Sequence, residues 1–266
     1  MPERILTKIP PIRIEQRRFT NAFVEAYAKW HRKTEVHNAE NILKIKELLD
    51  QGVPVIGAFN HLGHLDGPLI PTELKNVSPE LRKLFTAIMG EVIWRNHLTR
   101  SFMHAYDGIL VPSSRIKPEE GDAQSWVVRT EWQKEADEET ANALSDGRFV
   151  GLCPEASRSR DKGMKRPSPK IARYFYLVPN IHLVPIGMWG TEKVFPPDTK
   201  IIFPTRFWHR PHMSVGKPIS VRELEERIGV SETKGENDQK LVDELMYKIA
   251  SLIPPQYQGY YALPRS

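Results

Sequence analysis

The chain has 266 residues, of which 40% are hydrophobic and 27% charged. This is an ordinary globular composition, and one large α/β domain is expected rather than two small ones. The net charge of +5 favours an anionic partner without choosing among a phosphorylated substrate, an acidic carrier, a membrane surface and nucleic acid. The single cysteine excludes an intrachain disulfide and favours a reducing, cytosolic location. No signal-peptide pattern opens the sequence and no window holds the about 18 apolar residues of a membrane span, so any action on lipid is expected at the membrane surface.

Residues 1–50 are expected to form an N-terminal two-helix piece. The segment 12–33 has aromatic residues every three or four positions from Phe19 to Trp30, beside several arginines and lysines. This pattern is typical of a helix that packs on a domain through its aromatic stripe, and also of a helix that lies on a membrane. The second helix is expected over 38–50.

Strands alternate with helices after this piece, which predicts an α/β domain over 51–266 with a mixed, largely parallel sheet flanked by helices. Short apolar runs bounded by glycine, proline and polar residues indicate the strands, and longer runs with helical spacing indicate the helices. Strands are expected at 53–59, 84–89, 108–111, 149–153, 181–188 and 212–215. One helix is expected to begin at residue 66. Further helices are expected over 93–105, 122–145, 169–178, 221–228 and 238–252.

A histidine and an aspartate follow the first predicted strand. His61 and Asp66 are five residues apart in a segment that Gly63, Gly67 and Pro68 mark as a turn. In one continuous helix they would point about 140° apart, whereas a tight turn into a helix can bring them together. An imidazole whose second nitrogen is held by a carboxylate can take a proton from a hydroxyl. The alternative is that Asp66 only caps the helix and His61 only fills the turn.

His64 raises an alternative of a different class. His61, His64 and Asp66 carry the nitrogen and oxygen ligands of a zinc site, which would make the protein a metallohydrolase. Such a site needs further ligands, and the later histidines at 182, 209 and 212 show no paired spacing that would complete it. We therefore expect no metal.

The turn after the fourth predicted strand carries both acid and base. Arg158 and Arg160, with Arg115 from the end of another strand, have the planar guanidinium that pairs with two oxygens of a phosphate. Glu155 is expected to orient an arginine or backbone amides. Cys153 ends an apolar strand, which favours a buried, inert thiol over a nucleophile. A solvated basic turn is the alternative for the arginines.

Four predicted strands end in polar clusters. The carboxyl ends of parallel strands meet at one edge of a sheet, so we expect the four clusters to line one crevice. This convergence is stronger evidence than any cluster alone. The clusters lie at 60–66, 112–115, 154–160 and 189–192.

The segment Asn60–Asp66 resembles the N-H-x-x-x-x-D motif of the glycerolipid acyltransferases, the family typified by 1-acyl-sn-glycerol-3-phosphate acyltransferase. The segment 153–161 is similar to the family's F-P-E-G-T-R-S-R-D block. The resemblance extends over about residues 50–220. The second, third and fourth blocks and a later signature follow in the family's order, at 108–115, 153–161, 183–187 and 216–219.

The resemblance implies an O-acyltransferase of phospholipid synthesis. It implies transfer of a fatty acyl group from acyl-coenzyme A or acyl carrier protein to the free hydroxyl of a lysophosphatidate-like acceptor, with no further cofactor and no nucleic-acid partner. His61 is implied as the general base and Asp66 as the residue that orients it. It also implies a peripheral location on the cytoplasmic face of a membrane. The implied substrate-binding residues are Arg115, Glu155, Ser157 and Arg158 at the acceptor phosphate and Pro185 at the acyl side.

The sequence departs from the family pattern at three places. Gly63 stands where the family usually has serine or threonine, Ala156-Ser157 replaces Gly-Thr, and Cys153 replaces phenylalanine. The open alternatives are acyl transfer to another lipid or glycolipid hydroxyl and a lipid-binding protein without catalysis.

Overall fold

A computed structural model describes residues 34–63, 66–91, 107–113, 122–159, 161–194, 209–229 and 233–262. The helices predicted over 12–33 and 93–105 lie outside the described residues. The division of the chain at residue 50 stays a prediction.

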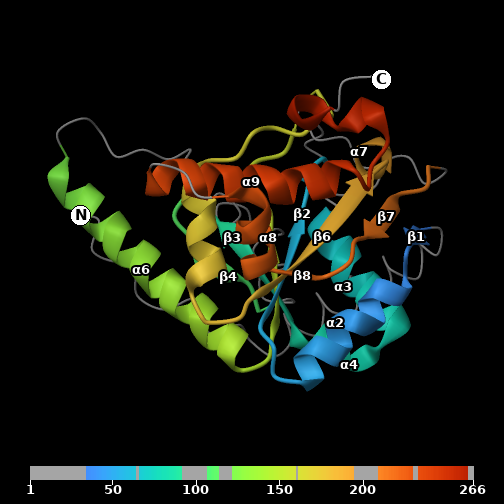
Figure 1. Cartoon of the computed structure of the whole chain (residues 1–266), viewed down its shortest axis with the longest axis horizontal. Coiled ribbons are helices and arrows are strands. Elements are labelled where there is room, and N and C mark those ends of the chain that lie inside the picture. The colour runs from blue at the N-terminus through green and yellow to red at the C-terminus, as the bar shows by residue number, and fades with distance from the viewer. Residues whose placement is uncertain are drawn as a thin grey trace, which may run out of the picture.

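An eight-stranded sheet organises the described residues, in the order β1-β7-β6-β2-β5-β3-β4, with β8 paired to β6 (Figure 1). Strands β2 to β6 run parallel, whereas β7 and β8 are antiparallel to β6. The predicted class, α/β with a mixed, largely parallel sheet, is confirmed. The strands are β1 (Glu35–His37), β2 (Val55–Phe59), β3 (Phe85–Gly90), β4 (Ile109–Val111), β5 (Phe149–Leu152), β6 (His182–Trp189), β7 (His212–Val215) and β8 (Ile219–Ser220).

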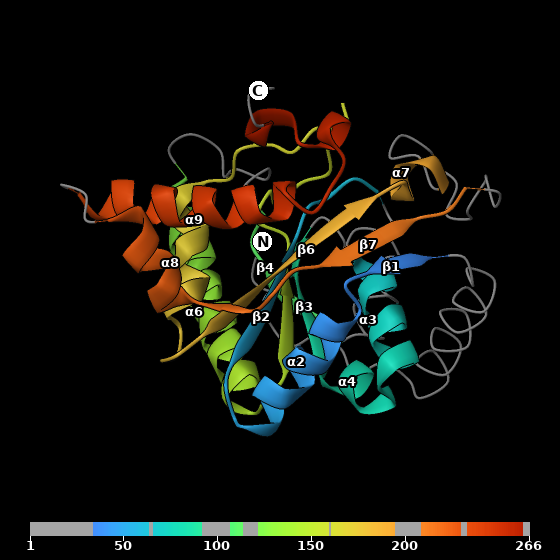
Figure 2. The ribbon, with the colours of Figure 1, turned by 45° about the vertical axis from the view of Figure 1, so that its right-hand side comes forward.

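Helices cover both faces of the sheet (Figures 1 and 2). One face carries α2 (Glu40–Asp50), α3 (Asp66–Val77) and α4 (Pro79–Leu84). The other carries α6 (Ala123–Ser145), α8 (Val221–Ile228), α9 (Lys234–Ala250) and the 3-10 helix η2 (Pro169–Tyr176). Three short elements complete the described chain: α7 (Thr191–Val194), η3 (Pro255–Tyr257) and η4 (Gly259–Tyr261).

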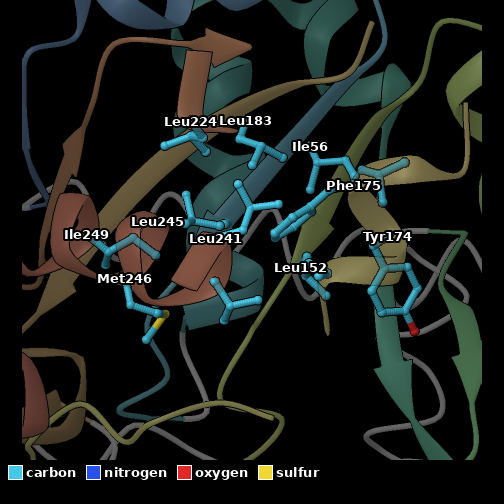
Figure 3. Packing of buried hydrophobic residues seen from close by; sticks show 14 of the residues in the cluster. Ile56, Leu152, Tyr174, Phe175, Leu183, Leu224, Leu241, Leu245, Met246 and Ile249 are labelled. Carbon is cyan, nitrogen blue, oxygen red and sulfur yellow. The ribbon is translucent and has the colours of Figure 1, made fainter. Parts of the chain in front are cut away.

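Successive side chains of β2 point to opposite faces of the sheet, which explains why helices pack on both faces. Ile56 faces α9 and packs with Leu241 and Leu245 (Figure 3), whereas its neighbour Val55 faces α2 and packs with Ile42. All of these side chains are fully or almost fully buried, and each contributes about 1.5–3 kcal/mol through removal from water. Because a strand turns successive side chains to opposite faces, an unbroken apolar run such as 53–59 requires cover on both sides.

The differences from the predicted elements have local causes. Helix α9 begins at Lys234 rather than at 238, because the Thr233 side chain accepts a hydrogen bond from the Glu236 N–H and so caps the helix earlier. The helix predicted over 169–178 is a 3-10 helix. Strands β1 and β8 were not predicted, because two or three residues carry too little alternation to be recognised.

Proline in the interior of β6 is accommodated by a break in the neighbouring strand. Pro185 pairs with Ala58 of β2 and accepts a hydrogen bond from the Gly216 N–H (2.8 Å). Gly216 lies in the break between β7 and β8, so the missing N–H of the proline faces no ladder partner. A Cβ at Gly216 would lie 2.6 Å from Pro185 Cγ, which explains why a glycine stands there.

Candidate active site

The turns after β2, β5 and β6 meet at the carboxyl edge of the sheet, as three of the four polar clusters were expected to do. Buried Asn60 donates to the Met188 carbonyl (2.8 Å) and accepts from the Met188 N–H (2.7 Å), which ties the end of β2 to the end of β6. The Ser159 N–H donates to the His61 carbonyl (2.8 Å), which ties the turn after β5 to the turn after β2. The fourth cluster is described only as far as Ser113.

His61 and Asp66 are in direct contact. His61 Nδ1 lies 2.8 Å from Asp66 Oδ2. Because a carboxylate can only accept, this hydrogen bond requires the imidazole to carry its hydrogen on Nδ1. The imidazole is 28% exposed, and its second nitrogen, Nε2, is on the opposite side of the ring from the aspartate. A turn into α3 therefore brings the two predicted side chains together and directs one ring nitrogen away from the carboxylate.

The Asp66 carboxylate is held by the backbone. Its Oδ2 also accepts from the Leu62 N–H (2.6 Å) and the Gly63 N–H (2.8 Å), and the side chain is fully buried. Asp66 is the first residue of α3, where the helix dipole stabilises negative charge. The other oxygen, Oδ1, is buried without a hydrogen-bond partner among the described residues. Gly63 contributes only its N–H, whereas the serine or threonine usual in the family would add a hydroxyl donor to the same turn.

Glu155 fixes the backbone on which His61 stands. Its Oε1 accepts from the His61 N–H (3.0 Å) and its Oε2 from the Lys165 N–H (2.9 Å). This is one of the two arrangements expected for Glu155, the orientation of backbone amides. Burial raises the pKa of Glu155 from 4.5 to about 7, against the opposing effect of these two N–H groups and the Lys165 charge. Both the N–H and the carbonyl of His61 are thus held by the turn after β5.

That turn also carries a cation that the sequence did not single out. Lys165 Nζ donates to the Arg158 carbonyl (2.7 Å) and lies 3.4 Å from Ser157 Oγ. Half-buried Ser157 and Arg158 are therefore brought beside an ammonium group. Ala156 has φ of 52°, a left-handed conformation in which glycine is free and alanine strained. The replacement of the family's glycine thus keeps the turn at a conformational cost.

Cys153 does not have the environment of a nucleophile. Desolvation raises the pKa of its thiol well above the usual range, and the neighbouring carboxylates of Glu155 and Asp66 raise it further. The thiol therefore stays protonated near neutral pH and is a poor nucleophile.

Of the remaining predicted residues the structure describes Pro185, which lies inside a strand and not in a turn at the carboxyl edge. Pro185 is buried within β6 beside the β7–β8 break. Arg115, Arg160 and His64 lie outside the described residues. Among the residues that the structure describes, a group able to hold a metal is formed by Glu35, His37 and His212, and it includes neither His61 nor Asp66.

Comparison with known proteins identifies the family. The model of the family described as Acyltransferase matches residues 33–189, more than half of the chain. The chain belongs to the Acyltransferase family. This assignment confirms the resemblance drawn from the sequence and establishes acyl transfer as the general activity.

The fold of this acyltransferase is similar to a solved structure. The 1-acyl-sn-glycerophosphate (LPA) acyltransferase PlsC from Thermotoga maritima matches with a TM-score of 0.51 and 17% sequence identity. The match covers 86% of this chain and 76% of that chain. A search of curated proteins gives no match. At this identity the likeness establishes the fold. No helix in the described part of the acyltransferase is both long and apolar enough to cross a bilayer.

Two residues of the site were missed by sequence reasoning. Asn60 was recognised only as part of a motif, although an amide at a strand end can replace a backbone pair, as it does here with Met188. Lys165 was not singled out, because nothing in its spacing distinguishes a lysine that folds back onto a turn from one that points into solvent.

Proposed function

We propose that this acyltransferase moves a fatty acyl group from an acyl thioester to the free hydroxyl of a lysophosphatidate-like acceptor in phospholipid synthesis. The observation that carries the proposal is the hydrogen bond between His61 Nδ1 and the buried Asp66 carboxylate. It fixes the tautomer of the imidazole and leaves Nε2 as the base for a hydroxyl. The Thermotoga maritima protein of similar fold is an LPA acyltransferase, which supports the same choice of acceptor.

The proton moves through one residue. Nε2 of His61 takes the acceptor's hydroxyl proton as the hydroxyl oxygen attacks the thioester carbonyl carbon. Asp66 stabilises the imidazolium that forms, while its own charge is held by the Leu62 and Gly63 N–H groups. Collapse of the tetrahedral intermediate breaks the carbon–sulfur bond, and the imidazolium returns its proton to the leaving thiolate. The products are an ester and a free thiol, without a covalent enzyme intermediate.

The acceptor phosphate is assigned to the turn after β5. Lys165 places an ammonium group beside the Ser157 hydroxyl in this turn, and Arg158 in the same turn supplies a guanidinium for the phosphate. Glu155 braces the turn against His61. Arg115 is proposed to join them from the end of β4. An anion bound here would lie on the turn that is hydrogen-bonded to the His61 backbone, so binding the phosphate would also place the acceptor near the base.

The donor and location follow from the same proposal. An acyl thioester of coenzyme A or acyl carrier protein is anionic, as is the surface of many membranes, and the net charge of +5 favours association with both. We place the enzyme peripherally on the cytoplasmic face of a membrane, with Pro185 and its strand on the acyl side and no cofactor beyond the two substrates.

The test is an acyl-transfer assay with the full chain. Labelled acyl-coenzyme A and acyl-acyl carrier protein are supplied as donors, and lysophosphatidate, other lysophospholipids and monoacylglycerol as acceptors. The proposal predicts preference for lysophosphatidate over monoacylglycerol, and loss of this preference in Arg158→Ala. Equal rates with the phosphate-free acceptor, together with indifference to Arg158→Ala, would instead favour acyl transfer to another lipid or glycolipid hydroxyl.

A further inference from the structure

Three potential metal ligands converge on the outer strands β1 and β7, at the carboxyl end of their neighbour β6. Glu35 and His37 come from β1, and His212 opens β7. His37 Nε2 lies 3.4 Å from His212 Nδ1. The Glu35 carboxylate lies 3.8 Å from His37 Nε2 through Oε1 and 3.6 Å from His212 Nδ1 through Oε2. One ligand atom from each residue can be chosen so that all three lie within 4.8 Å of one another.

The distances suit a small tetrahedral ion. Zinc takes histidine nitrogen at about 2.0–2.1 Å and carboxylate oxygen at about 2.0–2.2 Å, which separates neighbouring ligands by about 3.4 Å. The two nitrogens of His37 and His212 are already at this separation. The Glu35 oxygens are only slightly farther away, and the Glu35 side chain is 52% exposed, so a rotamer change can close the difference. Two histidines and one carboxylate leave a fourth position for water.

The sheet holds the two imidazoles in place. β1, β7 and β6 lie side by side (Figure 2), with Glu35 opposite His212 and His212 opposite Trp189. The Trp189 indole stacks on His212 with ring centroids 4.8 Å apart and on His37 at 5.2 Å. One aromatic plane therefore supports both rings and keeps their nitrogens close to the separation that a tetrahedral ion requires.

We propose that Glu35, His37 and His212 form a site for a divalent transition-metal ion, with Zn²⁺ as the best match. Imidazole nitrogens with one carboxylate exclude the hard, all-oxygen sites of Ca²⁺ and Mg²⁺ and suit zinc. The bound ion joins the start of β1 to the start of β7, two segments that are 175 residues apart in the chain, and so stabilises the sheet edge. The Glu35 carboxylate supplies negative charge to the site. The positive charges of Lys193 and Arg210 also act on His212 and oppose it.

The competing arrangement is a proton shared between the two histidines. The two nitrogens lie 3.4 Å apart, within reach of a hydrogen bond, and the ring planes are within 14° of parallel. Metal binding releases this proton to solvent and requires each ring to turn about its Cβ–Cγ bond so that both lone pairs converge on the ion. The experiment below distinguishes a metal site from a histidine pair that holds only a proton.

The test uses the full chain without a histidine tag, after treatment with a chelator, titrated with Zn²⁺ by calorimetry and with Co²⁺ by visible absorption. The expected result is one ion per chain and a tetrahedral Co²⁺ spectrum. His37→Ala and His212→Ala are each expected to weaken binding by more than about 100-fold, because loss of a supporting residue alone typically costs about 10–100-fold in metal affinity. His182→Ala, which removes a histidine of β6 outside the cluster, is the matched control and is expected to bind normally.

The fold is controlled within the same experiment. Glu35→Gln removes the charge but keeps the size of an exposed side chain, so it is expected to fold and to lose affinity. A rise in melting temperature on Zn²⁺ addition, present in the parent and in His182→Ala but absent in the three cluster variants, supports the site. Absence of saturable binding by the parent, or binding that all three cluster variants retain, overturns the proposal. Because the cluster excludes His61 and Asp66, neither result depends on acyl transfer.

Discussion

The carboxyl edge of the sheet carries two groups in which a carboxylate approaches a histidine, and they differ in how the carboxylate is held. Asp66 is fully buried, and two backbone N–H groups fix the same oxygen that contacts His61. Glu35 has a half-exposed side chain and reaches His37 and His212 only at 3.8 and 3.6 Å. The first group is preorganised for one proton transfer, whereas the second can adjust its geometry to an ion.

This difference shows what separates a catalytic pair from a ligand cluster when both contain the same residue types. Catalysis requires groups that do not reorganise during the reaction, and backbone hydrogen bonds to a buried carboxylate supply that rigidity. Coordination requires several donors that can converge on one point. Each of the following variants changes one side of this comparison.

The largest effect on kcat is expected from Asp66→Asn. The matching variant of the other group, Glu35→Gln, is its control. Asparagine cannot hold the imidazolium by charge, so kcat for acyl transfer is expected to fall by about 10²–10⁴-fold. Glu35→Gln is expected to keep full kcat, since it alters only the adjustable cluster. Turnover per mole of folded enzyme, with folding followed by circular dichroism, measures both. Equal kcat in the two variants would remove the functional distinction between the groups.

Glu155→Gln tests whether the His61 turn depends on its buried brace. The pKa of Glu155 is raised from 4.5 to about 7 in the folded chain. Between these pH values the folded state keeps a proton that the unfolded state has released, so the contribution of Glu155 to stability is full below pH 4.5 and is lost as pH rises through 7. At about 1.4 kcal/mol per pH unit, the loss is about 3 kcal/mol.

The measurement is urea unfolding of the parent and Glu155→Gln at pH 5 and pH 8. The parent is expected to lose about 2–3 kcal/mol more than the variant over this interval, because glutamine does not titrate and part of the loss already occurs below pH 5. Parallel stability curves for the two proteins would mean that the carboxyl group is not the buried, proton-binding brace described above.

Lys165→Met tests whether phosphate is bound at the catalytic edge. Loss of one charge-assisted contact is expected to raise KM for lysophosphatidate about 10-fold, equivalent to about 1.4 kcal/mol, and to leave monoacylglycerol unaffected. Lys170→Met removes a nearby exposed lysine and is expected to change neither value. Equal increases with both acceptors would assign Lys165 a purely structural role.

Ala156→Gly has the smallest expected effect and concerns the strain in the turn that supports His61. Glycine adopts the left-handed conformation without the strain of alanine, which raises the free energy of unfolding by about 1–2 kcal/mol. The greater freedom of glycine in the unfolded chain lowers it again by about 0.4–1 kcal/mol. We expect net stabilisation of about 0.5–1 kcal/mol in urea unfolding. Ala143→Gly within helix α6 is the opposite control and is expected to destabilise by about 1 kcal/mol. Destabilisation by Ala156→Gly would show that the turn carries no such strain.

The local features of the molecule were predictable from the sequence. Apolar runs bounded by glycine and proline located β2 and β5, because a strand covered on both faces needs apolar side chains at every position. His61 and Asp66 are close in sequence, so a turn signal was sufficient to place them together. The family's motif order supplied the rest of the prediction for this edge.

The remaining features depend on tertiary contacts that no short window records. β1 has only three residues and forms because β7 offers it a partner, and His37 meets His212 through that pairing alone. Lys165 is held at the turn after β5 because its backbone N–H donates a hydrogen bond to the carboxylate of buried Glu155. These contacts join residues through the assembled sheet, and spacing along the chain says nothing about them.

The central claim is that His61, held by Asp66, is the base for acyl transfer. Its most direct test is transfer of a labelled acyl group from the preferred donor to lysophosphatidate by His61→Ala, beside His37→Ala as the matched histidine variant. We predict that His61→Ala loses at least about 100-fold in kcat at an unchanged melting temperature, and that His37→Ala keeps its activity. Full transfer by folded His61→Ala would contradict the account.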